Sequence, residues 1–303
     1  MTRKKHDQYS KQFVAELLEP QGEIKVNYEI PPGEAHYTDL YFKPFATANF
    51  QTLGLLGKIA VHHCLLEPFR NPPTKIEIQT CLQKLFTLRS ELLNEQERYK
   101  KSLSEEEKKK VKAIPEEELP RLWILATSAS DNSLKSLGVA PKQGWCEGVY
   151  FLPETIRTAI ISINRLPKTP ETLLLRLLGK GATQKQAIEE IRALSEDNAL
   201  RNHVEGLLYR WHICVESQNE LIPDDKEILM NLSEIVKERQ EKLRQQGLQQ
   251  GMQQIVENLL RFRFGKIDEA LSQAIKRLLN LPPDESSRLI LQSSREELLA
   301  KLS

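Results

Sequence analysis

Residues 23–42 constrain the fold more than any other segment, because two runs of strand-like alternation flank a turn sequence. In the first run the apolar side chains share one face of a strand, at Ile24, Val26, Tyr28 and Ile30. A Pro-Pro-Gly triplet then supplies the turn. In the second run the same alternation groups Asp39 with Tyr37 and Tyr41. The segment therefore predicts a β-hairpin whose second strand carries one carboxylate among aromatic side chains.

Asp39 is a candidate ligand for a cation, because an unpaired charge is costly to bury. Residues 61–69 (VHHCLLEPF) are a compact apolar run typical of a buried strand, and Glu67 falls near its end, where sheet-borne sites usually open. Carboxylates on neighbouring strands can hold Mg²⁺, which activates water and neutralises charge on a phosphodiester. Asp39 and Glu67 are therefore candidate metal ligands. A solvated or strand-pairing role for Asp39 is the alternative that the spacing leaves open.

A basic residue near the activated water would complete such a site. Two residues after Glu67, at the lysine position of an E-x-K pattern, stands Phe69, which cannot take this role. Lys75 follows shortly after the strand and can take it if the chain turns back towards the acids. The candidate catalytic residues are thus Asp39, Glu67 and Lys75.

Residues 75–79 (KIEIQ) have two interpretations. As a strand, they place Lys75, Glu77 and Gln79 on one face, which gives an alternative register for the site. As a helix, they follow Asn71 and two prolines, a typical helix start, and apolar residues continue well beyond them at helical spacing. We favour the helix, in which Lys75 and Gln79 belong to a stripe at four-residue spacing that can still face the acids.

The composition bounds the partners and the compartment. The 303-residue chain is 28% charged with a formal net charge of +1, so any contact with DNA must come from a local basic patch. Its four cysteines include no CxxC pair, which is typical of a reducing cytosol rather than of a disulfide scaffold or a zinc ribbon. No apolar stretch reaches the roughly 18 residues that a membrane helix needs. We expect a soluble cytoplasmic protein that does not enter a membrane.

Strand and helix signals divide the chain into two halves. A helical pattern at 7–18 precedes the hairpin, and further strand signals follow at 121–127 and 148–152. From residue 171 onward every strong pattern is helical, at 171–178, 184–194 and 200–215. This order predicts an α/β N-terminal core, with a mixed sheet flanked by helices, followed by an all-α C-terminal half.

A long amphipathic stretch at 228–260 is interrupted by a Gln-Gly repeat, QQGLQQGMQQ, at 245–254. The repeat places Leu248 and Met252 one turn apart, while each glycine costs a helix roughly 1 kcal/mol relative to alanine. This stretch is a candidate surface for a homo-oligomer. The expected divisions of the chain are 1–165 (α/β core), 166–222 (helical extension), 223–264 (long amphipathic, coiled-coil-like helix) and 265–303 (small helical domain).

Three segments carry a resemblance to known families. The first resembles the N-terminal core of the PD-(D/E)XK nuclease superfamily. It consists of HDQYSKQFVAELLEPQGEIKVNYEI and HYTDLYF, followed by LLEPF and a helix. Residues 151–191 and the Gln-Gly repeat are similar to bacterial proteins described as recombination-promoting nucleases or putative transposases. Residues 261–302 look like a small C-terminal domain of unknown function found in such proteins. The resemblance implies a core of helix, three strands, helix and strand.

The resemblance also implies roles for particular residues. In the superfamily, an acid of the second strand and the acid of the E-x-K strand bind Mg²⁺, and the lysine positions the attacking water. Asp39 matches the first acid and Glu67 the second, and Phe69 departs from the lysine. Since the superfamily tolerates a lysine on the following helix, Lys75 is a substitute. Glu77-Ile78-Gln79 resembles a motif of the recombination-promoting group. This resemblance again gives the alternative register, in which Glu77 and Gln79 belong to the site.

The expected function is therefore Mg²⁺-dependent DNA endonuclease activity in a recombination- or transposase-associated family. The alternative is a catalytically degenerate nuclease fold that acts as an oligomerisation or interaction module. Phe69 at the lysine position and the long Gln-rich stretch motivate this alternative.

Overall fold

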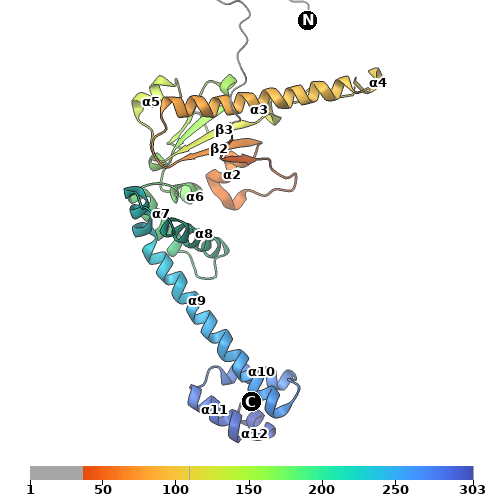
Figure 1. Ribbon diagram of the computed structural model, residues 1–303, viewed down its shortest axis with the longest axis vertical. Coiled ribbons are helices and arrows are strands. Elements are labelled where there is room, and N and C mark those ends of the chain that lie inside the picture. Colours follow the sequence, from red (N-terminus) through yellow and green to blue (C-terminus); the bar gives the residue numbers. More distant parts are fainter. Residues whose placement is uncertain (1–36, 109, 303) are drawn as a thin grey trace, which may run out of the picture. The chain divides into compact units, whose positions relative to one another are not determined.

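The computed structural model describes residues 37–108 and 110–302, and Asp39–Ser303 form one compact unit (Figure 1). The predicted helix at 7–18, the first hairpin strand and the Pro-Pro-Gly turn lie outside the described residues. The described chain has a mixed five-stranded sheet with helices in its first half and is helical in its second half. The coarse fold class predicted from the sequence is thereby confirmed.

The sheet has the strand order β1-β2-β3-β5-β4. Its strands are β1 (Leu40–Phe42), β2 (Cys64–Phe69), β3 (Arg121–Ala126), β4 (Val149–Phe151) and β5 (Thr158–Ser162). β1 runs antiparallel to β2, and β4 antiparallel to β5, while β2, β3 and β5 are parallel to one another. β2, β3 and β4 lie within the three runs that the sequence predicts as strands.

The interior strand β5 is the strand that sequence periodicity does not identify. Its sequence, TAIIS, is buried at every position because helices or loops cover both faces of the sheet there. A strand buried on both faces shows no alternation of apolar and polar residues. β5 nevertheless pairs with β3 on one side and β4 on the other.

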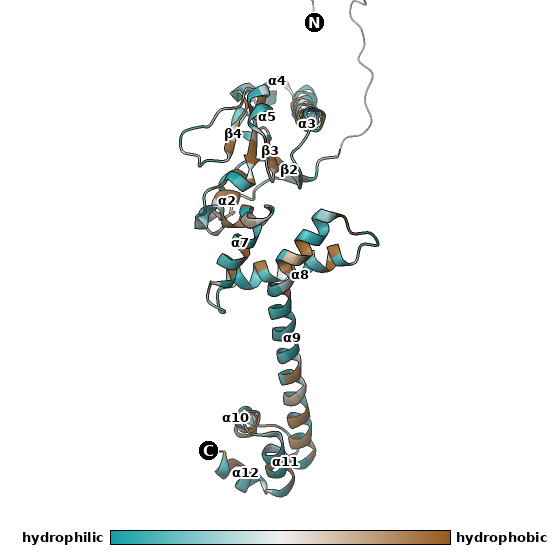
Figure 2. Ribbon diagram, turned by 90° about the vertical axis from the view of Figure 1, so that its left-hand side faces the viewer, coloured by the Kyte–Doolittle hydropathy of each residue, from teal (hydrophilic) through white to brown (hydrophobic). Residues whose placement is uncertain are grey.

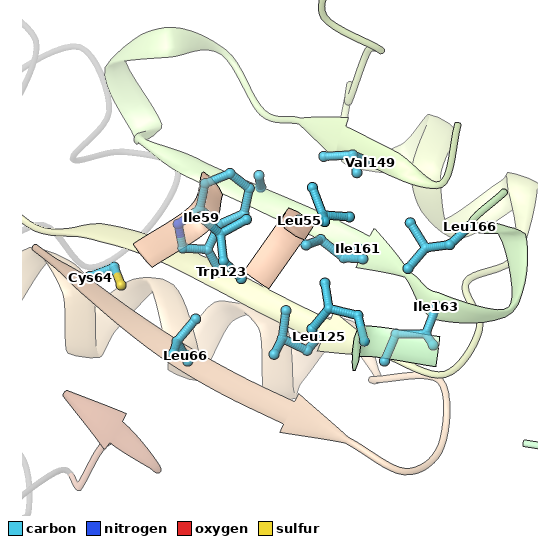
Figure 3. Close-up of a cluster of buried hydrophobic side chains, with 12 residues drawn as sticks. Leu55, Ile59, Cys64, Leu66, Trp123, Leu125, Val149, Ile161, Ile163 and Leu166 are labelled. Carbon is cyan, nitrogen blue, oxygen red and sulfur yellow. The ribbon is translucent and has the colours of Figure 1, made fainter. Parts of the chain in front are cut away.

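One face of the sheet packs on α2 (Gly54–Ala60) through the apolar cluster in Figure 3. Leu66, Trp123, Val149 and Ile161 come from the strands, and Leu55 and Ile59 from α2. Full burial of one such side chain stabilises the fold by about 1.5–3 kcal/mol. This cluster therefore holds α2 against the sheet.

The other face of the sheet packs on α3 (Lys75–Lys101). Leu65, Leu122, Ile124 and Ile160 come from the strands, and Ile78, Cys81 and Leu85 from the helix. Because side chains alternate along a strand, Glu67 shares the α3 face with Leu65. The acid therefore lies between the sheet and α3.

The start of α3 differs from the expected one. Its N-cap is Thr74, three residues later than Asn71: Glu77 N donates to Thr74 Oγ1 at 3.2 Å, and Thr74 N donates to Glu77 Oε2 at 2.7 Å. This reciprocal pair is a capping box, which satisfies two backbone donors at the helix start. The helical interpretation of residues 75–79 is confirmed, and the strand register through Glu77 and Gln79 is wrong.

The shorter helical elements connect these layers. Two are the α-helices α4 (Glu105–Lys108) and α5 (Asp131–Ser136). The others are the 3₁₀ turns η2 (Gln51–Leu53), η3 (Glu116–Glu118), η4 (Glu154–Ile156), η5 (Ile163–Arg165) and η6 (Pro170–Thr172).

The second half contains the three helices predicted from 171–215. They are α6 (Leu173–Arg176), α7 (Ala182–Arg192) and α8 (Ala199–Glu216), and they share an apolar cluster with the first turns of the long helix α9 (Pro223–Phe264). The last turns of α9 pack with α10 (Glu269–Leu278), α11 (Pro283–Gln292) and α12 (Arg295–Lys301) in a separate cluster.

The helix α9 runs without a break through the Gln-Gly repeat, although the repeat interrupts the amphipathic pattern of the sequence (Figure 2). Its buried side chains lie only towards its two ends, at Ile228, Asn231, Leu232, Ile235, Val236, Val256 and Leu260. Between residues 237 and 255 no side chain of α9 is buried. Within the described part of the chain, the middle of the helix therefore contributes no side chain to the apolar clusters at its two ends.

Candidate active site

Glu67 is a buried acid near the carboxyl end of β2. Its side chain is 2% exposed and shares the α3 face with Leu65 and Phe69. Phe69, at the position where an E-x-K motif has lysine, packs against the apolar cluster on this face. A carboxylate in such surroundings needs a positive partner, since a buried unpaired charge is costly.

Lys84 of α3 supplies that partner. Its Nζ donates to Glu67 Oε2 at 2.9 Å and to Oε1 at 3.1 Å, and the lysine side chain is only 16% exposed. Lys84 follows Cys81 by three residues, which places it at the edge of the stripe that faces the sheet. Sequence reasoning missed Lys84, and a lysine at the edge of an apolar helical stripe was the signal that could have found it.

Lys75 does not take this place. It is the first residue of α3 and is exposed. It precedes Lys84 by nine residues, about two and a half helical turns, so the two side chains leave opposite sides of the helix. Glu77 uses its carboxylate in the capping box, and Gln79 is exposed. The structure brings Lys84, rather than any of these three, to Glu67.

Asp39 lies directly before β1, the strand that pairs with β2. Leu40, the first residue of β1, pairs with Leu66, which places Asp39 at the end of β1 nearest Glu67. Asp39 is exposed, in contrast to Glu67. One exposed and one buried carboxylate therefore lie at this edge of the sheet.

The thiol of Cys81 responds to the charges of this site. Burial, and then the charge of Glu67, raises the pKa of Cys81 to about 12; Lys84 acts in the opposite direction, and Asp39 adds to the rise. A charge raises a neighbouring pKa only when it is close. The charges of both acids and of the lysine therefore act on one buried thiol of α3, as does that of Glu77.

The number of carboxylates limits the kind of metal site that Asp39 and Glu67 could form. Among the described residues, no group of three or more His, Cys, Asp and Glu side chains could hold a metal ion. Mg²⁺ keeps several waters and is commonly bound through one or two carboxylates together with substrate phosphates. Asp39 and Glu67 alone cannot form a cage built from protein ligands, and Lys84 Nζ already contacts both carboxylate oxygens of Glu67.

Comparisons of the chain with family models, with curated proteins and with solved structures find no match. No helix in the described part of the chain combines the length and the apolar character needed to cross a bilayer.

Proposed function

We propose that the protein is a Mg²⁺-dependent endonuclease of the PD-(D/E)XK type, with its active site at Asp39, Glu67 and Lys84. The contact of Lys84 Nζ with both carboxylate oxygens of Glu67, at the sheet edge where Asp39 also lies, carries the proposal. The proposed site therefore contains two acids and a lysine at one edge of the sheet, although Phe69 occupies the usual lysine position.

The energetics of the ion pair support a functional role. Replacing a buried ion pair by well-packed apolar residues is often neutral or stabilising, so stability alone is a weak reason to keep one. The pair lies on the α3 face of the sheet, which carries the apolar side chains of Leu65 and Phe69 on either side of Glu67. A charged pair there is more readily explained by chemistry than by packing.

Each residue of the proposed site would have its own role. Bound Mg²⁺, held by Asp39 and Glu67, would supply positive charge for the scissile phosphate and acidify water. Lys84 Nζ holds Glu67 in place and carries three N–H donors, which can orient a water or a phosphate oxygen. The aliphatic stem of Lys84 lies against the sheet, so its amine has a defined position.

The test compares two lysines of the same helix. We expect Lys84→Gln, Asp39→Asn and Glu67→Gln each to lower Mg²⁺-dependent nicking of supercoiled DNA about 100-fold or more, the usual size of a lost group that stabilises charge in the transition state. Lys75→Gln, which removes the same charge from the exposed start of α3, should retain activity within about twofold of the parent protein. Thermal unfolding of each variant shows whether it is folded.

Mn²⁺ binding, followed by electron paramagnetic resonance, separates metal binding from catalysis. Asp39→Asn and Glu67→Gln should weaken binding, whereas Lys84→Gln should strengthen it, because the lysine competes with the metal for Glu67. Nicking that is unchanged in all three folded variants would rule out the proposal.

A second candidate function, self-association, is favoured by an exposed apolar stripe on α9. The stripe consists of Leu248, Met252, Ile255, Leu259 and Phe262, which are 36–90% exposed. Spacings of four and three residues alternate along it, which is the a/d pattern of a coiled-coil seam. Residues 245–256 contain no charge that would repel a second copy. We propose that this seam, rather than the whole of 228–260, pairs two copies of the chain.

A further inference from the structure

A cavity with three basic residues in its lining lies away from Glu67, where β3 and β5 begin. Its volume is about 280 Å³, and three of its lining residues are basic: Arg121, Lys142 and Arg157. Glu154 is the one acid in the lining. In the sheet register, Arg121 pairs with Cys64, the first residue of β2, whereas Glu67 pairs further along with Ile124. The cavity is therefore separate from the proposed active site.

Arg157 is held rigidly at this cavity. Its side chain is 9% exposed; Nη2 donates to Leu119 O at 2.8 Å, and Nη1 lies 3.7 Å from Glu116 Oε1. Its Nε is buried without a hydrogen-bond partner in the described part of the chain. Arg157 is also the one non-glycine residue with positive φ, at 49°, among the described residues. Such a conformation costs of order 1–3 kcal/mol and persists where surrounding contacts enforce it.

Arg121 and Lys142 add positive charge that no acid neutralises directly. The described residues place no carboxylate oxygen within 4.0 Å of either side chain. The Arg121 guanidinium instead lies 5.9 Å from the ring centre of Trp123, and Lys142 Nζ lies 5.7 Å from that of Phe151. Aromatic faces of this kind orient a cation without cancelling its charge.

The charge of Arg121 acts on the guanidinium of Arg157. Burial, and then the charge of Arg121, lowers the pKa of the Arg157 guanidinium, which Glu116 partly offsets. Burial likewise lowers the pKa of Arg121, with Glu154 acting in the opposite direction. Like charges gathered in a partly dehydrated cavity favour an anion that would neutralise them.

We propose that this cavity binds the phosphate group of a small molecule. The guanidinium of Arg121 can match phosphate oxygens by two parallel hydrogen bonds, and Arg157 and Lys142 add further charge. The volume of about 280 Å³ is at the small end of ligand sites, which suits a phosphate with a short substituent. The site is independent of DNA cleavage at Glu67.

The test is calorimetric titration of the full-length protein with pyrophosphate and with inorganic phosphate. We expect saturable binding that the double variant Arg121→Gln/Lys142→Gln weakens about tenfold or more, since charge-assisted hydrogen bonds are lost. The matched control, Lys135→Gln/Arg288→Gln, removes the same charge from exposed positions outside the cavity and should change the affinity less than about twofold.

A third variant distinguishes binding from stability. Glu154→Gln removes the one acid from the cavity lining and should tighten phosphate binding severalfold, which loss of structure cannot do. No saturable binding of either anion by the parent protein, or equal weakening by the control variant, would overturn the proposal. So would binding of a single-stranded oligonucleotide that depends on Arg121 and Lys142 while the small anions do not bind.

Discussion

The two most deeply buried cysteines lie on opposite faces of the sheet. Cys64 belongs to the cluster packed on α2, and Cys81 to the face covered by α3. Burial raises the pKa of Cys64 to about 11; burial and the charge of Glu67 raise that of Cys81 to about 12. Both thiols therefore stay protonated and unreactive in the folded protein well above neutral pH.

This pKa difference makes stability depend on alkaline pH. A thiol whose pKa is raised by folding keeps its proton in the folded state after the unfolded chain has lost it. The contribution of Cys64 and Cys81 is therefore complete below about pH 9, the ordinary thiol pKa, and is lost as the pH rises towards 11–12.

We expect the free energy of unfolding, measured by urea denaturation, to decline above pH 9 and to decline less steeply in Cys81→Ala. Cys214→Ala, which removes an exposed cysteine, is the control and should keep the parent slope. Equal slopes in all three proteins would contradict this assignment.

Among the elements, α9 shows how context overrides a local preference. Gly247 and Gly251 disfavour a helix, yet the element continues through both because each end is held in an apolar cluster. A Cβ added at either glycine would meet no atom within 4 Å. The glycines therefore weaken the helix without serving a packing need inside the chain.

We expect Gly247→Ala and Gly251→Ala each to stabilise this part of α9 by about 0.5–1 kcal/mol, through the lower backbone entropy of alanine in the unfolded chain. Slower amide hydrogen exchange across residues 245–255 would report the gain. Gly54→Ala is the opposite case: its φ is +53°, and the new Cβ would lie 2.3 Å from Glu171 O, so this variant should lose stability. Faster exchange in the two helix variants would contradict the account.

For the whole molecule, the proposed pairing of two copies depends on the exposed seam on α9. A coiled-coil seam is stabilised by apolar side chains at the a and d positions, and a charge placed there is costly to bury. We expect the double variant Met252→Glu/Ile255→Glu to be monomeric in sedimentation velocity under conditions in which the parent protein is dimeric.

Gln250→Glu is the matched control, because residue 250 lies on the opposite side of α9 from the seam. It should keep the parent sedimentation coefficient. A parent protein that stays monomeric at high concentration would exclude self-association through this seam, and it would leave the nuclease proposal unaffected.

Local periodicity was sufficient to predict the strands within 61–69, 121–127 and 148–152 and the helices that follow residue 171. It also singled out Asp39 and Glu67, because acids are conspicuous in strand-like runs. These predictions rest on residues close together in sequence. Their apolar side chains recur with the period of a strand or of a helix.

The choice of Lys84 over Lys75, the strand β5 and the basic cavity were decided only by tertiary structure. Which side of α3 meets the sheet depends on how Ile78, Cys81 and Leu85 pack. A rotation of α3 by half a turn about its own axis would bring Lys75 to the side that Lys84 now occupies. β5 is recognisable through its pairing partners, because burial on both faces removes its alternation. The cavity gathers Arg121, Lys142 and Arg157 from separate segments, a proximity that no local pattern contains.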